Sequence, residues 1–341
     1  MRIYLTPILK ESKSPTQNPY IKDLINALEN NGHTIVNKNR PSNIGLFDIL
    51  FYLNKVDAIY FNWIEDLVAT RLGILQTIYV YLSCFIFKLF NKKIIWTLHN
   101  KISHSKDYLF LKMINTYMLL NYSDLVITHS SDGLEFSKQF LKDESNNIHF
   151  IHHPIHNNLG RYQDIQVEKK YDILIWGAIS PYKNVDVFLE YLEKKDLLNK
   201  YNICILGKIS NKILEDKIMK YKSEKIKIIN KFVDDNLLEK YINISKIILF
   251  TYSPGNTFAS GSLMYSLSYG SNIIGPNVGS FKDLEDENLI HTFNNFHHLI
   301  KVINIAFSEK ISENKKLLEF IENNNWDYFG KKISKYIKEK E

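Results

Sequence analysis

The stretch TFASGSLMYSLSYGSNIIGP, residues 257–276, places small polar residues directly before an apolar helical segment, which ends at a glycine and a short strand. Ser260, Gly261 and Ser262 can bury little apolar surface, so their position needs another reason. A helix that begins here leaves its first backbone N–H groups free to bind an anion, phosphate in particular. Ordinary N-capping by Ser260 or Ser262 is the alternative. The stretch by itself is compatible with both.

Short β-branched and aromatic runs alternate with longer amphipathic segments along the rest of the chain, which predicts parallel strands joined by helices. In the first half we expect strands at RIYLT (2–6), HTIV (33–36), AIYFN (58–62), KIIWTLH (93–99), DLVITHS (124–130) and IHFIHH (148–153). In the second half we expect them at DILIWG (172–177), NICILG (202–207), KIIN (227–230), KIILFTY (246–252) and SNIIGP (271–276). The polar segment 154–169 is typical of a linker, so the sequence predicts two α/β units.

Composition limits the classes of protein. A chain of 341 residues exceeds the usual size of a single core, so two domains are expected. The net charge of +6 comes almost wholly from lysine, which argues against sequence-specific nucleic-acid binding and leaves an anionic membrane surface open. Cys84 and Cys204 lie far apart in apolar runs, and no export signal is visible at the N-terminus. We therefore expect a cytoplasmic protein.

Residues 74–87, ILQTIYVYLSCFIF, carry no charge, and Lys88, Lys92 and Lys93 follow at once. The segment is too short for a confident bilayer span. It suits either a helix buried in the core or a helix that lies in a membrane interface. The adjoining lysines favour partial exposure.

A second informative stretch is WGAISPYKN, residues 176–184, at the end of the first strand of the second half. Gly177 permits a tight exit from the strand and Pro181 stiffens the turn. Lys183 would then present a cation at the carboxyl end of the sheet. Together with the amides near Ser260 it would form a diphosphate site, although a lysine at a strand end is often simply solvated.

These stretches resemble a known family. GAISPYKN is similar to the glycine-to-lysine donor loop of GT-B glycosyltransferases, especially the family 4-like group, and 257–276 is similar to their donor-binding signature. NPYIKDLINALENNGHTI (18–35) resembles the first helix of the acceptor domain, WTLHN (96–100) its histidine-bearing loop, and SDLVITHS (123–130) the next strand. NNNWDYFGKKISKYIKEK (323–340) resembles the last helix, which crosses back onto the first domain.

The resemblance implies an α/β protein of the GT-B architecture, in which two Rossmann-like domains face each other across a cleft. It implies an acceptor-binding domain over residues 1–155, a nucleotide-sugar-binding domain over 170–318 and a returning helix over 319–341. The implied activity is transfer of a sugar from a nucleoside-diphosphate sugar to a glycan or a polyprenyl-diphosphate-linked acceptor in bacterial surface polysaccharide synthesis. The implied reaction retains anomeric configuration. Such an enzyme would work at the inner face of the cell membrane, with possible peripheral membrane contact.

The resemblance also assigns site residues. Lys183 would neutralise the donor diphosphate, the amides around Gly261 and Ser262 would hold its distal phosphate, and His99 would orient a hydroxyl of the transferred sugar. The implied catalytic residues are His99 and Lys183. The implied donor-binding residues are Gly177, Lys183, Phe232, Val233, Thr257, Ser260, Gly261, Ser262 and Tyr265. The implied acceptor-side residues are Asn18, Trp63 and Asn100.

We expect no metal and no cofactor besides the nucleotide-sugar co-substrate. No Asp-x-Asp motif lies at a predicted strand end, and a lysine with a helix N-terminus would stabilise the leaving diphosphate instead. The histidines of 149–156 look like a metal tract. Alternation along a strand would send neighbours to opposite faces, and no carboxylate or cysteine completes a site.

The chain departs from the family pattern at three positions. Ala178 stands where an arginine commonly follows the donor-loop glycine. Thr257 and Tyr265 stand where the family has two glutamates, and neither carries a carboxylate. Two other functions therefore stay open: a non-catalytic glycan- or nucleotide-binding partner of another transferase, and a non-hydrolysing nucleotide-sugar epimerase.

Overall fold

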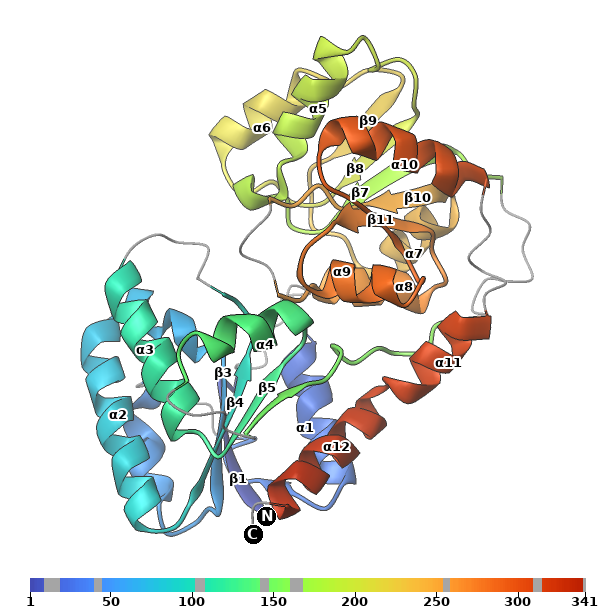
Figure 1. Cartoon of the computed structure of the whole chain (residues 1–341). Coiled ribbons are helices and arrows are strands. Elements are labelled where there is room, and N and C mark those ends of the chain that lie inside the picture. Colours follow the sequence, from blue (N-terminus) through green and yellow to red (C-terminus); the bar gives the residue numbers. More distant parts are fainter. Residues whose placement is uncertain are drawn as a thin grey trace. The chain divides into compact units, whose positions relative to one another are not determined.

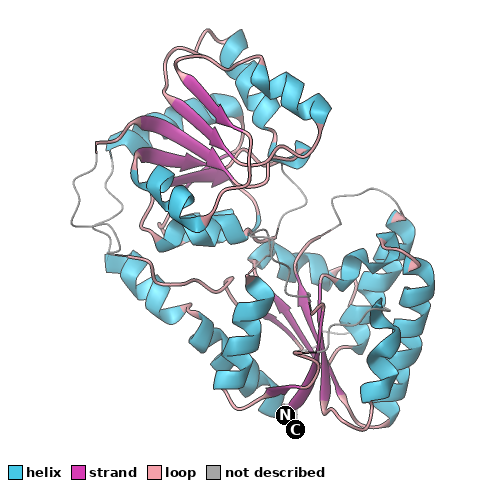
Figure 2. Cartoon of the chain, turned by 180° about the vertical axis from the view of Figure 1, so that it is seen from behind, coloured by secondary structure: helices cyan, strands magenta, loops and turns pink. Residues whose placement is uncertain are grey.

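The computed structural model describes residues 1–8, 19–39, 45–101, 108–141, 147–159, 168–253, 258–308 and 315–339. The chain forms two compact units (Figure 1). The first contains Met1–Pro154, Asn256–Ala259 and Asn324–Glu341, and the second contains Ile155–Gly255 and Ser260–Asn323. Each unit is a parallel sheet with helices on both faces (Figure 2).

The first unit contains a six-stranded sheet in the order β2-β1-β3-β4-β5-β6. Its strands are β1 (Arg2–Thr6), β2 (Thr34–Ile35), β3 (Ala58–Asn62), β4 (Lys93–Leu98), β5 (Leu125–Thr128) and β6 (Ile148–Phe150). Its helices are α1 (Tyr20–Asn30), α2 (Gly73–Leu89), α3 (Leu109–Tyr122), α4 (Ser131–Lys138) and α12 (Trp326–Lys338), with 3-10 turns at η1 (Gly45–Tyr52) and η2 (Ile64–Ala69).

The second unit contains a six-stranded sheet in the order β12-β11-β10-β7-β8-β9, in which two runs of strands extend in opposite directions from the pair β7 and β10. Its strands are β7 (Tyr171–Trp176), β8 (Ile203–Leu206), β9 (Ile226–Ile229), β10 (Ser245–Leu249), β11 (Ile273–Pro276) and β12 (His291–Phe293). Its helices are α5 (Val185–Lys194), α6 (Lys212–Met219), α7 (Asp235–Asn243), α8 (Gly261–Ser268), α9 (Gly279–Asp286), α10 (Phe296–Ser308) and α11 (Lys315–Asn323), with a 3-10 turn at η3 (Pro181–Lys183).

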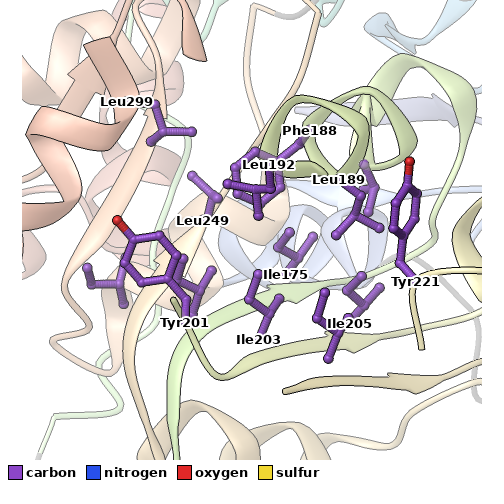
Figure 3. Close-up of a cluster of buried hydrophobic side chains, with 14 of the residues drawn as sticks. Ile175, Phe188, Leu189, Leu192, Tyr201, Ile203, Ile205, Tyr221, Leu249 and Leu299 are labelled. Carbon is purple, nitrogen blue, oxygen red and sulfur yellow. The ribbon is translucent and has the colours of Figure 1, made fainter. Parts of the chain in front are cut away.

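Each face of each sheet has its own buried cluster, because strands that are covered on both sides must be apolar on both sides. In the second unit, one face packs β7 and β8 residues against Phe188 and Leu192 of α5 and Leu299 of α10 (Figure 3). In the first unit, one face packs against α1 and α12, and the other packs against α2 and α3.

Helix α12 belongs to the first unit although it is the last helix of the chain. An added Cβ on Gly330 would lie 2.5 Å from Ala27 O, so only glycine lets α12 approach the backbone of α1 this closely. His33 Nε2 and Ser334 Oγ lie 2.8 Å apart and form a hydrogen bond across the same contact. Phe329 and Ile333 are buried there.

The unit boundaries differ from the sequence-based ones in several places, one of which is that Asn256–Ala259 belongs to the first unit. The expected boundary at residue 318 falls inside α11, whose Leu317, Phe320 and Ile321 belong to the core of the second unit. Because a helix is continuous, the chain changes units only after α11, at Asn324. The second unit also begins at Ile155 instead of residue 170, since Ile155 is buried in that core.

Candidate functional site

The order of strands in the second unit marks a place for a ligand. In open α/β sheets, ligands bind outside the carboxyl ends of the strands at the point where the strand order reverses. Here that point lies between β7 and β10, which pair side by side. The segment after β7 contains Gly177 and Lys183, and the segment after β10 leads through Tyr252 to α8. The topology therefore brings together two of the stretches singled out in the sequence.

Gly177 leaves β7 with a φ of +100°, a conformation that disfavours side chains. Its backbone is packed against Gly207, which follows β8 with a φ of +150°. An added Cβ on Gly207 would lie 1.9 Å from Gly177 O, so the two backbones are in direct contact. Two glycines on neighbouring strands thus set the direction in which the loop toward Lys183 departs.

Lys183 is the most unusual charge of the second unit. Its side chain is only 4 % exposed, and Nζ donates a hydrogen bond to Trp176 O at 3.2 Å. Nζ also lies 5.3 Å from the centroid of the Tyr252 ring. Burial lowers the pKa of the Lys183 ammonium, and within the described part of the chain no carboxylate pairs with it. A buried cation without a counterion is costly, which indicates a site prepared for an anion.

The N-terminus of α8 faces this ammonium. An added Cβ on Gly177 would lie 2.8 Å from Lys183 Nζ and 3.5 Å from Ser262 Oγ, so the loop and the helix converge on one point. Ser260 is the N-cap, because its Oγ accepts a hydrogen bond from Leu263 N at 3.3 Å. Capping and anion binding are thus compatible, since the N–H groups of Gly261 and Ser262 still have no acceptor within the helix.

Tyr265 stands one turn further along α8, in a polar aromatic cluster. Its ring packs edge-on against Trp176 at a centroid distance of 5.6 Å, and its hydroxyl lies 3.2 Å from the hydroxyl of Tyr269. Tyr269 donates its hydroxyl hydrogen to the buried carboxylate of Glu239 on α7. The sequence reading missed Glu239, although its place on α7 beside Leu238 and three residues before Ile242 marks the buried side of that helix.

The remaining donor-side positions are less enclosed. Phe232 is 60 % exposed, whereas Val233 packs on the core of the second unit. Asp234 caps α7, since its Oδ1 accepts a hydrogen bond from Leu237 N at 2.8 Å. Thr257 lies outside the described residues, as does Asn18 on the acceptor side.

His99 belongs to the first unit and follows β4. Its Nε2 faces Asn62 Oδ1 at 3.1 Å, and its ring stacks on Trp63 at a centroid distance of 4.5 Å. Burial, and then the neighbouring His129 and His153, hold the pKa of His99 well below its usual range, so the ring is neutral. With its proton on Nε2, the ring keeps Nδ1 as an acceptor. Asn100 follows directly and is half-buried.

Three further rings surround His99 that the sequence reading did not include: Tyr20, His129 and His153. His129 Nδ1 donates to Ile151 O at 2.9 Å, so its Nε2 accepts from Tyr20 Oη, also at 2.9 Å. The sequence did contain a signal for His129. Because Leu98 pairs with Thr128, the residues that follow them, His99 and His129, occupy equivalent places on adjacent strands.

The buried histidines predict a loss of stability in acid. Burial lowers the pKa of His129 from 6.5 to about 3. As the pH falls below about 6.5, the unfolded chain binds a proton there that the native protein excludes. The free energy of unfolding should therefore decrease by about 1.4 kcal/mol per pH unit for this histidine, down to its native pKa.

Urea unfolding between pH 7 and pH 4.5 measures this slope. His129→Gln removes the titrating ring, so its stability should depend less steeply on pH than that of the wild type. His297→Gln, at an exposed position of α10, serves as the matched control and should keep the wild-type slope. A wild-type slope in His129→Gln would contradict the assignment.

The described residues contain no group of three or more His, Cys, Asp or Glu side chains that could hold a metal ion.

Comparison with known proteins assigns the fold. No family model matches the chain, and no curated protein matches it by sequence. Solved structures do match over its full length, and they identify the fold as GT-B. The Anabaena protein Alr3699/HepE in complex with UDP-glucose has a TM-score of 0.71 and 13 % identity, with 99 % of this chain and 100 % of that one covered.

Two further structures show how widely this fold is used. The lipopolysaccharide outer core galactosyltransferase WaaB matches with a TM-score of 0.63 and 14 % identity over 100 % of both chains. A Listeria monocytogenes protein assigned as a UDP-N-acetylglucosamine 2-epimerase matches with a TM-score of 0.55 and 11 % identity, over 99 % of this chain and 95 % of that one. The fold alone is therefore compatible with both sugar transfer and nucleotide-sugar epimerisation.

Proposed function

We propose that the chain is a glycosyltransferase that moves a sugar from a nucleoside-diphosphate sugar to a hydroxyl of a glycan or lipid-linked acceptor. The observation that carries the proposal is the buried ammonium of Lys183, which pairs with no carboxylate among the described residues and converges with the N-terminus of α8 at the switch point of the second sheet. A nucleoside diphosphate supplies the anion that this arrangement lacks. The UDP-glucose complex of HepE, which has the same fold, supports this choice of ligand.

The proposed chemistry depends on the negative charge of the leaving diphosphate. When the sugar leaves, negative charge develops on the diphosphate, and a donor aimed at that charge lowers the barrier. Lys183 would neutralise it, and the N–H groups of Gly261 and Ser262 would bind the distal phosphate with the help of the helix dipole. Because these groups are fixed before the donor arrives, little reorganisation accompanies the reaction. This is the basis on which we propose transfer without a metal.

His99 would act as a neutral hydrogen-bonding group toward a hydroxyl of the transferred sugar. Its lowered pKa keeps it uncharged at neutral pH, and its Nδ1 can accept from a hydroxyl. The family resemblance favours a retaining reaction, in which the departing phosphate can accept the proton of the acceptor.

We further propose a role in bacterial surface polysaccharide synthesis at the inner face of the cell membrane. The match to WaaB, which works on the lipopolysaccharide outer core, supports this setting. The acceptor would then be a glycan or a sugar chain on a polyprenyl diphosphate.

An epimerase is the second candidate, because the Listeria monocytogenes protein has the same fold. The two activities differ in their products. A transferase releases the free nucleoside diphosphate when it passes the sugar to an acceptor or to water. An epimerase instead returns an isomer of the nucleotide-sugar. A non-catalytic partner would bind a nucleotide or glycan and change neither.

The first experiment is a thermal-shift screen against UDP, GDP, ADP, CMP and dTDP, without metal and then with magnesium. One nucleoside diphosphate should raise the melting temperature selectively, because a ligand at about 100 times its Kd stabilises the native state by about 2.7 kcal/mol. The shift should be the same with and without magnesium. If none of the five raises the melting temperature in either condition, the donor-site assignment is wrong.

A further inference from the structure

Helix α2 presents its apolar side to solvent. Leu75, Ile78, Leu82, Phe85 and Leu89 are between 52 % and 65 % exposed. Their spacing alternates between three and four residues, which places them on one stripe of the helix. Single exposed apolar residues are common on proteins, but a contiguous apolar surface marks an interaction site.

The buried side of α2 is the more polar one. Gln76 and Ser83 are buried, and Gln76 Oε1 accepts from Leu46 N at 3.1 Å while its Nε2 donates to Arg71 O at 2.7 Å. Tyr79 Oη donates to Phe47 O at 2.8 Å. These bonds fix the rotation of the helix about its axis. The exposure of the apolar stripe is therefore built into the fold.

Helix α3 lies beside α2 in Figure 1 and has the same inverted arrangement. Leu109, Phe110 and Met113 are exposed, whereas Lys112 and Asn115 are buried. Asn115 ties the helices together, since its Oδ1 accepts from Tyr81 Oη at 3.2 Å and its Nδ2 donates to Ile64 O at 2.8 Å. We call the outer sides of these two helices the α2/α3 surface.

Basic residues outnumber acidic ones around the α2/α3 surface. Residues 65–124 contain seven basic and four acidic residues, a net charge of +3. Arg71 lies two residues before α2 and is exposed, and Lys88, Lys92 and Lys93 lie at and beyond the end of the helix. Lys88 pairs with Asp124 at 2.6 Å and Lys112 is buried, whereas Arg71 and Lys101 are exposed.

We propose that the α2/α3 surface docks on an anionic lipid bilayer, with the apolar stripe in the interface and the basic residues at the headgroups. Apolar side chains beside basic ones match such a surface. Two copies of the chain joined here would bring like charges together, which disfavours a dimer. Among the described helices none is long and apolar enough to cross a membrane, so the surface would lie on the bilayer. The inference extends the membrane location in the proposed function and does not depend on transfer activity.

The test is sedimentation of the full chain with vesicles of phosphatidylcholine alone or with added phosphatidylglycerol. The wild type should bind the anionic vesicles, and more weakly at higher salt. The double variant Ile78→Glu, Leu82→Glu should bind at least about tenfold more weakly, since two apolar side chains no longer enter the interface. Ile213→Glu, Ile305→Glu, at exposed positions of α6 and α10, is the matched control and should bind as the wild type does.

A fluorophore locates the contact directly. Ile78→Cys can be labelled with an environment-sensitive dye, because Cys84 and Cys204 are buried and burial raises the pKa of each thiol to about 12. Anionic vesicles should shift the emission at residue 78 and leave a dye on Ile213→Cys unchanged.

Three results would overturn the proposal. They are a wild type that does not bind anionic vesicles, a stripe variant that binds as tightly as the control, and a wild-type dimer without lipid that the stripe variant makes monomeric. The thermal-shift screen for nucleotides is independent of all three, so a failure of docking is distinguishable from a failure of the proposed function.

Discussion

Replacing Lys183 by Ala is expected to weaken binding of the selected nucleoside diphosphate by about 100-fold or more, about 2.7 kcal/mol, because removing one partner of a buried charge pair costs 2–5 kcal/mol. The ligand-free protein should stay folded. Lys183 has no carboxylate partner among the described residues, so its removal breaks no ion pair there and relieves the cost of burying a charge. Turnover should fall at least as far as affinity.

Calorimetric titration of the nucleotide, with thermal unfolding of the free protein, measures both effects. Lys183→Met keeps the length of the side chain and removes only the charge, so it separates the ammonium from packing. Lys246→Ala is the control, since Lys246 pairs at the surface with Asp172 at 2.8 Å in the same unit. A folded Lys183→Met variant with wild-type affinity would falsify the donor-site assignment.

Gly207→Ala is expected to destabilise the protein by at least about 3 kcal/mol, more than the 1–2 kcal/mol of a positive φ alone, because its Cβ also overlaps a neighbouring backbone. That Cβ would lie 1.9 Å from Gly177 O, and a backbone atom cannot rotate away as a flexible side chain can. Displacement of Gly177 would also move the loop that carries Lys183. Any folded fraction should therefore bind the nucleotide more weakly.

Urea unfolding of Gly207→Ala and Gly32→Ala measures the free energy of unfolding of each variant. The difference between them reports the cost of the overlap between the Gly207 Cβ and Gly177 O. Gly32 has a φ of +83° and nothing within 4 Å of its Cβ position, so its substitution carries strain without a collision. Equal stability of the two variants would show that the contact between Gly207 and Gly177 is not tight.

Much of the fold could be predicted because buried parallel strands appear in the sequence as short apolar runs. RIYLT and AIYFN coincide with β1 and β3, and every other run that we assigned to a strand overlaps one. β12 was missed, since it has only three residues, of which His291 and Thr292 are polar. A strand of this length depends on its neighbour β11 more than on its own sequence.

Individual residues of the site could be predicted from the sequence, but the contacts between them could not. Lys183 could be named from its place after a strand, but its burial depends on Trp176 at the end of β7 and on Tyr252, three residues after β10. The carboxylate of Glu239 on α7 likewise meets Tyr265 of α8 through Tyr269, the residue that ends α8. Hydrophobic periodicity predicts which side of a helix is apolar. The exposed apolar side of α2 shows that it does not predict which side is buried in the core.

The packing of α12 on α1 has a consequence for the order in which the protein takes shape during translation. One face of the first sheet is covered by Phe329, Ile333 and Ile337, which the ribosome adds some three hundred residues after Ile3 and Leu5 of the same cluster. Nearly all of the second unit emerges in between. The nascent N-terminal half therefore lacks the α12 residues that complete one of its cores while the second unit is being made, and the second unit can complete its own core first.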